Sequence, residues 1–356
     1  MTNDLSSLTE DHEALDSTAS LSWRTWLWQL FTCLTPLIVF TISFYIVVLA
    51  IIWSHGLKFV LFPVGELRLA AVLLIVCVMI GPMGLLAIRI ARDMILQIRG
   101  GEPPPLRERT RDLPRFFGQG FLLTAIYLIG SVPYVNLKPA IPLINSANYD
   151  AETEALERSL FAGTLPSEWL IERTPAWGVW FWDSVYGIFT LFMFISLTIA
   201  LHHEGFKGGA RLVLAYQIGL MIDVLFTLAI PTRGPLFVHP EWFHALDGLP
   251  SGELSAFLLE TIAEYQQSNR VYACAGISAM PSYHVYAWIC GFLCWRHLSR
   301  PLIVVGVILS ILNWLSTIVL GWHYALDGLA GIVLALLVCR FTAWLMPLPQ
   351  PSPCPE

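Results

Sequence analysis

The sequence predicts an all-α, polytopic membrane protein with about eight transmembrane helices. Hydrophobic residues make up 56% of its 356 residues, whereas charged residues make up only 13%, about half the share found in soluble domains. The mean hydropathy is +0.65. Several apolar stretches reach the roughly 20 residues that a membrane-spanning helix requires. The net charge of −6 argues against a nucleic-acid partner.

The chain starts with a polar, acidic segment, residues 1–25, which we expect to be a disordered cytoplasmic tail. It has neither the basic start nor the short apolar core of a signal peptide. The predicted spans that follow are Trp26–Ile52, Leu69–Ile88, Phe116–Leu137, Trp177–Leu201, Leu212–Pro231, Pro281–Leu298, Leu302–Trp322 and Tyr324–Leu345.

The sixth span is the shortest by hydropathy, because its purely apolar part covers only Val285–Trp295. It crosses the membrane only if Pro281 to His284 form its first turn, a position that suits proline.

Basic residues gather in the segments after the second, fourth and sixth spans, whereas the alternate loops are acidic. Cytoplasmic loops carry the excess of lysine and arginine. We therefore expect both termini in the cytoplasm and the loops 138–176 and 232–276 outside.

A stretch rich in proline and arginine, "GGEPPPLRERTRDLP", divides the chain. The domain organisation that we expect is a tail (1–25), an accessory helix pair (26–98), a cytoplasmic linker (99–115), a six-helix catalytic membrane domain (116–346) and a second cytoplasmic tail (347–356).

Two histidine motifs stand at span ends: "MPSYH", which ends at His284, and "GWHYALDG", which contains His323 and Asp327. His284 would lie in the first turn of a helix, where free N–H groups and the helix dipole attract an anion. His323 and Asp327 are four residues apart and share a face if the turn is helical. A carboxylate beside an imidazole fixes its tautomer and stabilises its protonated form.

These residues fall on one side of the membrane. His284 and His323 are 39 positions apart, which is the length of two crossings. No apolar run between Arg233, in "IPTRGP", and His284 is long enough to cross. Taken singly, Arg233 is typical of a snorkelling arginine and His284 of an interfacial histidine. Together with Asp327 they predict one pocket at the outer rim.

"PSYH" followed by "HYALD" resembles the type 2 phosphatidic acid phosphatase superfamily, over Lys207 to Arg340. That superfamily has Lys-x6-Arg-Pro, Pro-Ser-Gly-His and Ser-Arg-x5-His-x3-Asp elements. The resemblance implies a six-helix phosphatase-like core and these roles: His323 as the nucleophile that takes up the phosphoryl group, Asp327 as its partner, His284 as the acid and base, Arg233 as a phosphate clamp and Ser282 as a further hydrogen bond.

Three positions depart from the superfamily's pattern. Phe226 stands in place of the lysine, Tyr283 in place of the glycine, and Thr317 in place of the last arginine. Two cationic phosphate contacts are therefore missing, and a monoanionic phosphodiester needs such charge less than a dianionic monoester. The looser motifs are similar to the branch that contains inositol phosphorylceramide synthase and sphingomyelin synthase.

The function that we expect is phosphotransfer of a lipid headgroup at the outer membrane face, through a phosphohistidine. The resemblance to bacterial members implies a bacterial plasma membrane. The alternatives are a phosphatase acting on prenyl or glycerolipid phosphates, and a transporter, although a transporter should bind near mid-membrane. We expect a phosphorylated lipid in the bilayer as partner, and no metal or other cofactor.

Four further features complete the predictions. Asp183, six residues from the outer end of its span, faces the site, whereas Asp223 ties helices together at mid-span. "HALD" (His244–Asp247) imitates the second histidine motif but reads as a surface loop. Residues 149–172 form a short helix that lies flat on the outer surface.

Overall fold

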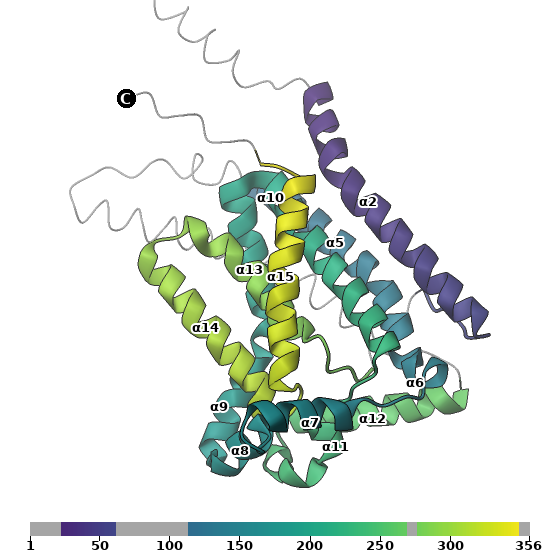
Figure 1. Ribbon diagram of the computed structural model, residues 1–356. Helices are drawn as coiled ribbons and strands as arrows, with labels where there is room; N and C mark the ends of the chain where they lie inside the picture. Colours follow the sequence, from purple (N-terminus) through teal and green to yellow (C-terminus); the bar gives the residue numbers. More distant parts are fainter. Residues whose placement is uncertain (1–22, 62–112, 269–275, 349–356) are drawn as a thin grey trace, which may run out of the picture.

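The computed structural model describes residues 23–61, 113–268 and 276–348 (Figure 1). Every regular element in these ranges is a helix, which confirms the all-α prediction. The second predicted span, Leu69–Ile88, and most of the proline-rich linker lie outside the described residues.

The first described helices are α2 (Trp23–Ser54) and α5 (Leu113–Leu137), which pack against each other. They match the first and third predicted spans. The fourth predicted span corresponds to α9 (Ala176–Gly187) and the first part of α10 (Phe189–Ala229), and the fifth corresponds to the last part of α10.

Helix α10 reverses direction at Gly205, whose φ of 68° lies in the left-handed region that favours glycine. The two arms run side by side in opposite directions (Figure 1). The 54 residues of α9 and α10 would extend to about 80 Å as one straight helix, far beyond a hydrocarbon core of about 30 Å. The reversal therefore makes two crossings of one apolar stretch.

The sixth predicted span is α13 (Tyr283–Phe292), continued by the 3-10 helix η4 (Leu293–His297). The helix begins two residues later than predicted. Ser282 is its N-cap and accepts a hydrogen bond from the Val285 amide, so Pro281 precedes the helix instead of forming its first turn. His284 is the second helical residue.

The last two helices are α14 (Arg300–Val319) and α15 (Ala325–Leu345). Together with Leu30–Ser54, Leu113–Ile144 and Ala176–Ala229 they give five described segments that are long and apolar enough to cross a membrane. Large apolar side chains such as Leu337 and Trp344 are exposed on α15, as expected for a lipid-facing surface.

Helix α13 lies in the middle of the bundle, between α10, α14 and α15. Trp288 is 1% exposed and stacks on Phe192 of α10, with ring centroids 3.8 Å apart. Between helices inside a bilayer, such contacts stabilise the bundle through van der Waals packing. On the other side, a Cβ at Gly331 of α15 would come 2.7 Å from the Ser282 carbonyl oxygen. This close packing fixes the position of His284.

Short helices form a layer at one end of the bundle, opposite the end where α15 terminates (Figure 1). They come from the two long loops that were predicted to share one side of the membrane. The helices are η1 (Lys138–Ala140), α6 (Ile141–Ile144), α7 (Asp150–Leu160), α8 (Pro166–Arg173), α11 (Pro235–Val238), η2 (Pro240–Trp242), η3 (His244–Leu246) and α12 (Pro250–Ser268).

Candidate active site

The three sequence motifs meet at this end of the bundle through backbone hydrogen bonds. Each pair of motifs is joined by one backbone–backbone bond, in which Ala279 and Leu236 directly flank their motifs. The bonds run from the Ala279 N–H to the Thr232 carbonyl (3.0 Å), from the Ser282 N–H to the Asp327 carbonyl (3.0 Å) and from the Leu236 N–H to the Gly321 carbonyl (2.8 Å). Backbone bonds of this kind hold the loops in register independently of the side chains that they carry.

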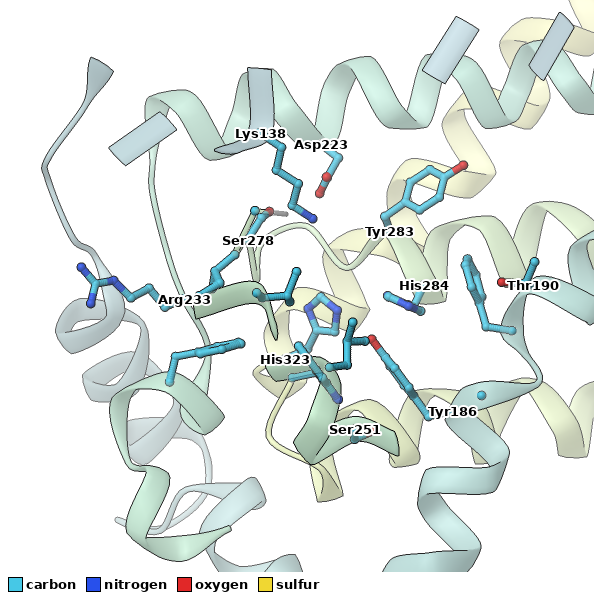
Figure 2. Close-up of a pocket in the computed structure, with 18 of the residues that line it drawn as sticks. Lys138, Tyr186, Thr190, Asp223, Arg233, Ser251, Ser278, Tyr283, His284 and His323 are labelled. Carbon is cyan, nitrogen blue, oxygen red and sulfur yellow. The ribbon is translucent and has the colours of Figure 1, made fainter. Parts of the chain in front are cut away.

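The two motif histidines face each other across a cavity (Figure 2), with ring centroids 5.8 Å apart. The imidazole of His284 is stacked on Tyr186 at 4.6 Å and lies against Phe189 at 4.4 Å. Both aromatic residues come from the region where α9 ends and α10 begins. The structure thus brings together the two histidines that the sequence analysis paired.

His323 is 4% exposed, and its Nδ1 atom lies 2.7 Å from the Ala279 carbonyl oxygen. A carbonyl oxygen only accepts hydrogen bonds, so Nδ1 carries the hydrogen. In the neutral imidazole, Nε2 then keeps its lone pair. This is the tautomer that a nucleophilic histidine requires.

Asp327 lies beside His323, but the Ala279 carbonyl is the closer acceptor for that imidazole. The predicted partnership of Asp327 with His323 stays a prediction. Its Oδ2 atom is 3.7 Å from Nδ1, beyond hydrogen-bond range, and accepts the Tyr324 N–H at 2.7 Å. The carboxylate therefore caps the start of α15 and acts on the imidazole through its charge, while Ala279 fixes the tautomer.

The side chains of Ser282 and Arg233 are not arranged as direct contacts to a substrate in the cavity. Ser282 is fully buried, and its hydroxyl oxygen caps α13 by accepting the Val285 N–H. Arg233 borders the cavity, but its exposed side chain directs the guanidinium away from both imidazoles (Figure 2). The predicted contacts of these two residues with a substrate stay predictions.

The cavity has a volume of about 340 Å³, within the range of small-ligand sites. Its lining includes the carboxylates Asp183 and Asp223 as well as the aromatic rings of Tyr186 and Trp322. Asp183 faces the site, as expected, and accepts the Ser251 N–H at 3.0 Å. Asp223 was expected to tie helices together but also lines the cavity. Charged groups and apolar rings in one cavity suit an amphipathic ligand.

Comparison with known protein families matches residues 154–341, just over half of the chain, to the PAP2 superfamily. The chain belongs to the PAP2 superfamily. No curated protein and no solved structure matches it. Membership supports a phosphatase-type, lipid-related enzyme, and the helical membrane fold of the superfamily agrees with the architecture described above. The match does not distinguish branches within the superfamily.

Helix α7 of this PAP2 protein presents three carboxylates to the site loops. Asp150, Glu154 and Glu157 are spaced by four and three residues, so they share one face. Asp150 accepts the Arg233 N–H at 2.9 Å and the Tyr324 hydroxyl at 3.1 Å. Glu154 accepts the same hydroxyl at 3.2 Å. The stretch 149–172, predicted as one helix, forms the two helices α7 and α8. Helix α7 lies across the end of the bundle (Figure 1), with its acidic face buried against the site and not displayed to solvent.

The third carboxylate, Glu157, reaches the start of α15. Its Oε1 atom accepts the Leu326 N–H at 2.9 Å. Burial, together with the nearby charges of Asp327 and Glu154, raises the pKa of Glu157 to about 7. Burial also raises the pKa of Asp150, although two backbone N–H groups and Tyr324 donate to it. Helix α7 thus connects the loop that carries Arg233 to the second histidine motif.

The decoy motif "HALD" lies in the 3-10 helix η3, and the side chains of His244 and Asp247 are exposed, as expected for a surface loop. Within the described part of the chain, no group of three or more His, Cys, Asp or Glu side chains is arranged to hold a metal ion.

Lys138, whose side chain lines the cavity, was not among the predicted site residues. The available signal was its position directly after an apolar span, at the end that also carries Arg233 and both histidines.

Proposed function

We propose that this PAP2 protein transfers a phosphorylated lipid headgroup through a phosphohistidine at His323. The single observation that carries the proposal is the hydrogen bond from His323 Nδ1 to the Ala279 carbonyl. Because Nδ1 holds the hydrogen, Nε2 keeps the lone pair that attacks phosphorus.

In the first half-reaction, His323 Nε2 forms a bond to phosphorus, and the bond from phosphorus to the leaving alcohol oxygen breaks. Protonated His284 gives its proton to that oxygen. In the second half-reaction, neutral His284 takes a proton from an acceptor alcohol, whose oxygen attacks phosphorus. The N–P bond breaks, and both histidines return to their starting states.

The neighbouring residues support these steps. The Asp327 carboxylate, 3.7 Å from Nδ1, stabilises the positive charge that develops on His323. Ser282 caps α13 and so fixes the turn that carries His284. Arg233 reaches the phosphate after rotation of its exposed side chain, while its backbone N–H stays bonded to Asp150.

Transfer is favoured over hydrolysis by the missing cations. Phe226 and Thr317 replace a lysine and an arginine of the superfamily's pattern, and the Thr317 hydroxyl is engaged by the Trp314 carbonyl at 2.7 Å. A monoanionic phosphodiester suits this lower charge. We accordingly place the chain in the branch of inositol phosphorylceramide synthase and sphingomyelin synthase, and its site at the extracytoplasmic face of a bacterial plasma membrane.

A phosphatase acting on prenyl or glycerolipid phosphates is the second candidate, in which water replaces the acceptor alcohol. The cavity is lined mostly by residues near helix ends and in the loops beside them, which argues against a transporter, whose binding groups belong near mid-membrane.

The test uses purified protein in nanodiscs with phospholipids that carry labelled headgroup phosphate, with or without a lipid alcohol such as diacylglycerol or ceramide. We expect a new labelled lipid, lost in His323→Ala and His284→Ala. The matched control His244→Ala, at an exposed histidine of the same layer, should retain activity. Free phosphate as the product would favour the phosphatase. Headgroup binding without turnover would contradict both enzyme assignments.

A further inference from the structure

Lys138 enters the cavity from a part of the chain that carries none of the three motifs. It follows directly on α5, as the first residue of η1. Its ammonium donates to the Tyr134 hydroxyl at 2.7 Å and lies 5.1 Å from the centroid of that ring. Figure 2 shows the ammonium directed into the cavity, below Asp223 and on the side of the two imidazoles.

The stem of Lys138 is held in this direction by packing. A Cβ at Gly276 would overlap the Lys138 Cγ atom and come within 2.8 Å of its carbonyl carbon. The two following residues, Pro139 and Ala140, are buried. A lysine at the end of an apolar helix commonly snorkels toward water, but here the absence of a side chain at position 276 leaves room for the stem to point inward.

Lys138 brings a positive charge to the part of the cavity that contains the two histidines. Among the described residues that line it, the cations are Lys138 and Arg233, and the guanidinium of Arg233 points away from the histidines. Asp223 and His284 both lie within electrostatic range of the Lys138 ammonium. The ammonium therefore lies in the same cavity as the acid–base histidine, where it can contact a phosphate bound beside the two imidazoles.

We propose that Lys138 binds a non-bridging oxygen of the substrate phosphate and stabilises the charge of the transition state. The stabilisation of the transition state rests on the proposed function, whereas the binding of phosphate does not. An ammonium has three N–H donors. One is engaged by Tyr134, and another is available to a phosphate oxygen while Asp223 balances the charge of the empty site. Lys138 thus supplies, from a different helix, a cation that Phe226 and Thr317 do not provide.

A single ammonium also bears on the substrate class. It is a compact point charge that neutralises one negative charge. With Arg233 it provides two cations, against three in the superfamily's pattern. The site therefore favours a phosphodiester headgroup, which carries one negative charge, over a lipid monophosphate, which carries about two. Replacement by arginine retains the charge but requires more room than the Gly276 contact leaves.

The first experiment measures binding separately from chemistry. A lipid phosphonate, which resembles the phosphodiester but is not cleaved, is titrated into nanodiscs, with diacylglycerol as the uncharged comparison. Tryptophan fluorescence reports occupancy, since Trp322 lines the cavity. Loss of a hydrogen bond to a charged group costs about 1.5–3 kcal/mol. We therefore expect Lys138→Met to bind the phosphonate about 10- to 100-fold more weakly, with diacylglycerol binding unchanged.

The matched control is Lys58→Met, the same change at an exposed lysine outside the cavity, which should bind like the wild type. A second variant, Gly276→Ala, keeps the ammonium but displaces its stem, and should weaken phosphonate binding without altering charge. Lys138→Arg should bind more tightly than Lys138→Met.

Binding and turnover separate the two proposals. His323→Ala should have no turnover, and adding Lys138→Met to it should still weaken phosphonate binding. If the wild type binds the phosphonate and Lys138→Met does not, the Lys138 assignment holds even where no lipid is turned over and the proposed function fails. Equal phosphonate affinity of Lys138→Met and wild type, or no binding by the wild type, overturns the Lys138 assignment whatever the turnover.

Discussion

The buried carboxyl group of Glu157 makes the stability of this protein depend on pH in a specific direction. In the unfolded chain a glutamate has a pKa of 4.5, whereas burial raises the pKa of Glu157 to about 7. Between these values the folded protein holds a proton that the unfolded chain has released. The free energy of unfolding therefore falls as pH rises through this window and levels off above it. The difference in pKa corresponds to about 3 kcal/mol at most.

The variant Glu157→Gln tests this reasoning. Glutamine keeps an oxygen that accepts the Leu326 N–H but does not titrate. We expect wild type and variant to be about equally stable near pH 5, and the variant to be more stable near pH 8 by up to about 3 kcal/mol, or a few degrees in transition temperature. Thermal unfolding in nanodiscs across this range, followed by tryptophan fluorescence, gives both values.

The control is Glu152→Gln, the same change at an exposed position of α7, which should parallel the wild type at every pH. Asp150 also has a raised pKa, but it is present in both proteins, so the difference between them isolates Glu157. A stability difference that stays constant from about pH 5 to pH 8 would refute the reasoning, because Glu157 would then not titrate in this window.

Three further results are expected. Tyr324→Phe removes the hydroxyl that donates to two carboxylates of α7 and should lower the free energy of unfolding by about 1–2 kcal/mol; an unchanged transition temperature would show that α7 does not hold this turn. Gly234 has a φ of 93°, and a Cβ added there would lie 2.6 Å from the Trp322 carbonyl oxygen. Gly248 has a φ of 76°, and a Cβ added there would meet no atom within 4 Å. In thermal unfolding, Gly234→Ala should lower the free energy of unfolding by about 1–3 kcal/mol, clearly more than Gly248→Ala. A cysteine introduced at Glu152 should react with an impermeant maleimide in intact cells, and one at Lys207 only after permeabilisation; the reverse pattern would place the site in the cytoplasm.

Much of the architecture could be predicted because hydrophobic length and charge asymmetry act directly on a membrane helix. The reversal of the chain between the fourth and fifth predicted spans and the meeting of His284 with His323 follow from counting crossings, whereas its position at Gly205 comes from the structure. The start of α13 was misplaced because proline fits both the first turn of a helix and the position before its cap. Only the hydrogen bond to Ser282 decides between them.

The parts of the site that were missed leave little trace in the sequence. The partner of His323 is a backbone carbonyl at Ala279, and backbone atoms carry no residue signature. The acidic face of α7 has the spacing of an ordinary solvated helix, so its burial depends on tertiary packing. The direction of Lys138 depends on its contact with Gly276, which lies far away along the chain.

The most direct test of the central claim is to trap the covalent intermediate. The protein is mixed with a phospholipid labelled on its headgroup phosphate, quenched within one turnover and digested for mass spectrometry. The account predicts an acid-labile phosphoryl adduct on His323 that is absent in His323→Ala and forms more slowly in His284→Ala. Turnover without any adduct, or an adduct on another residue, would contradict it.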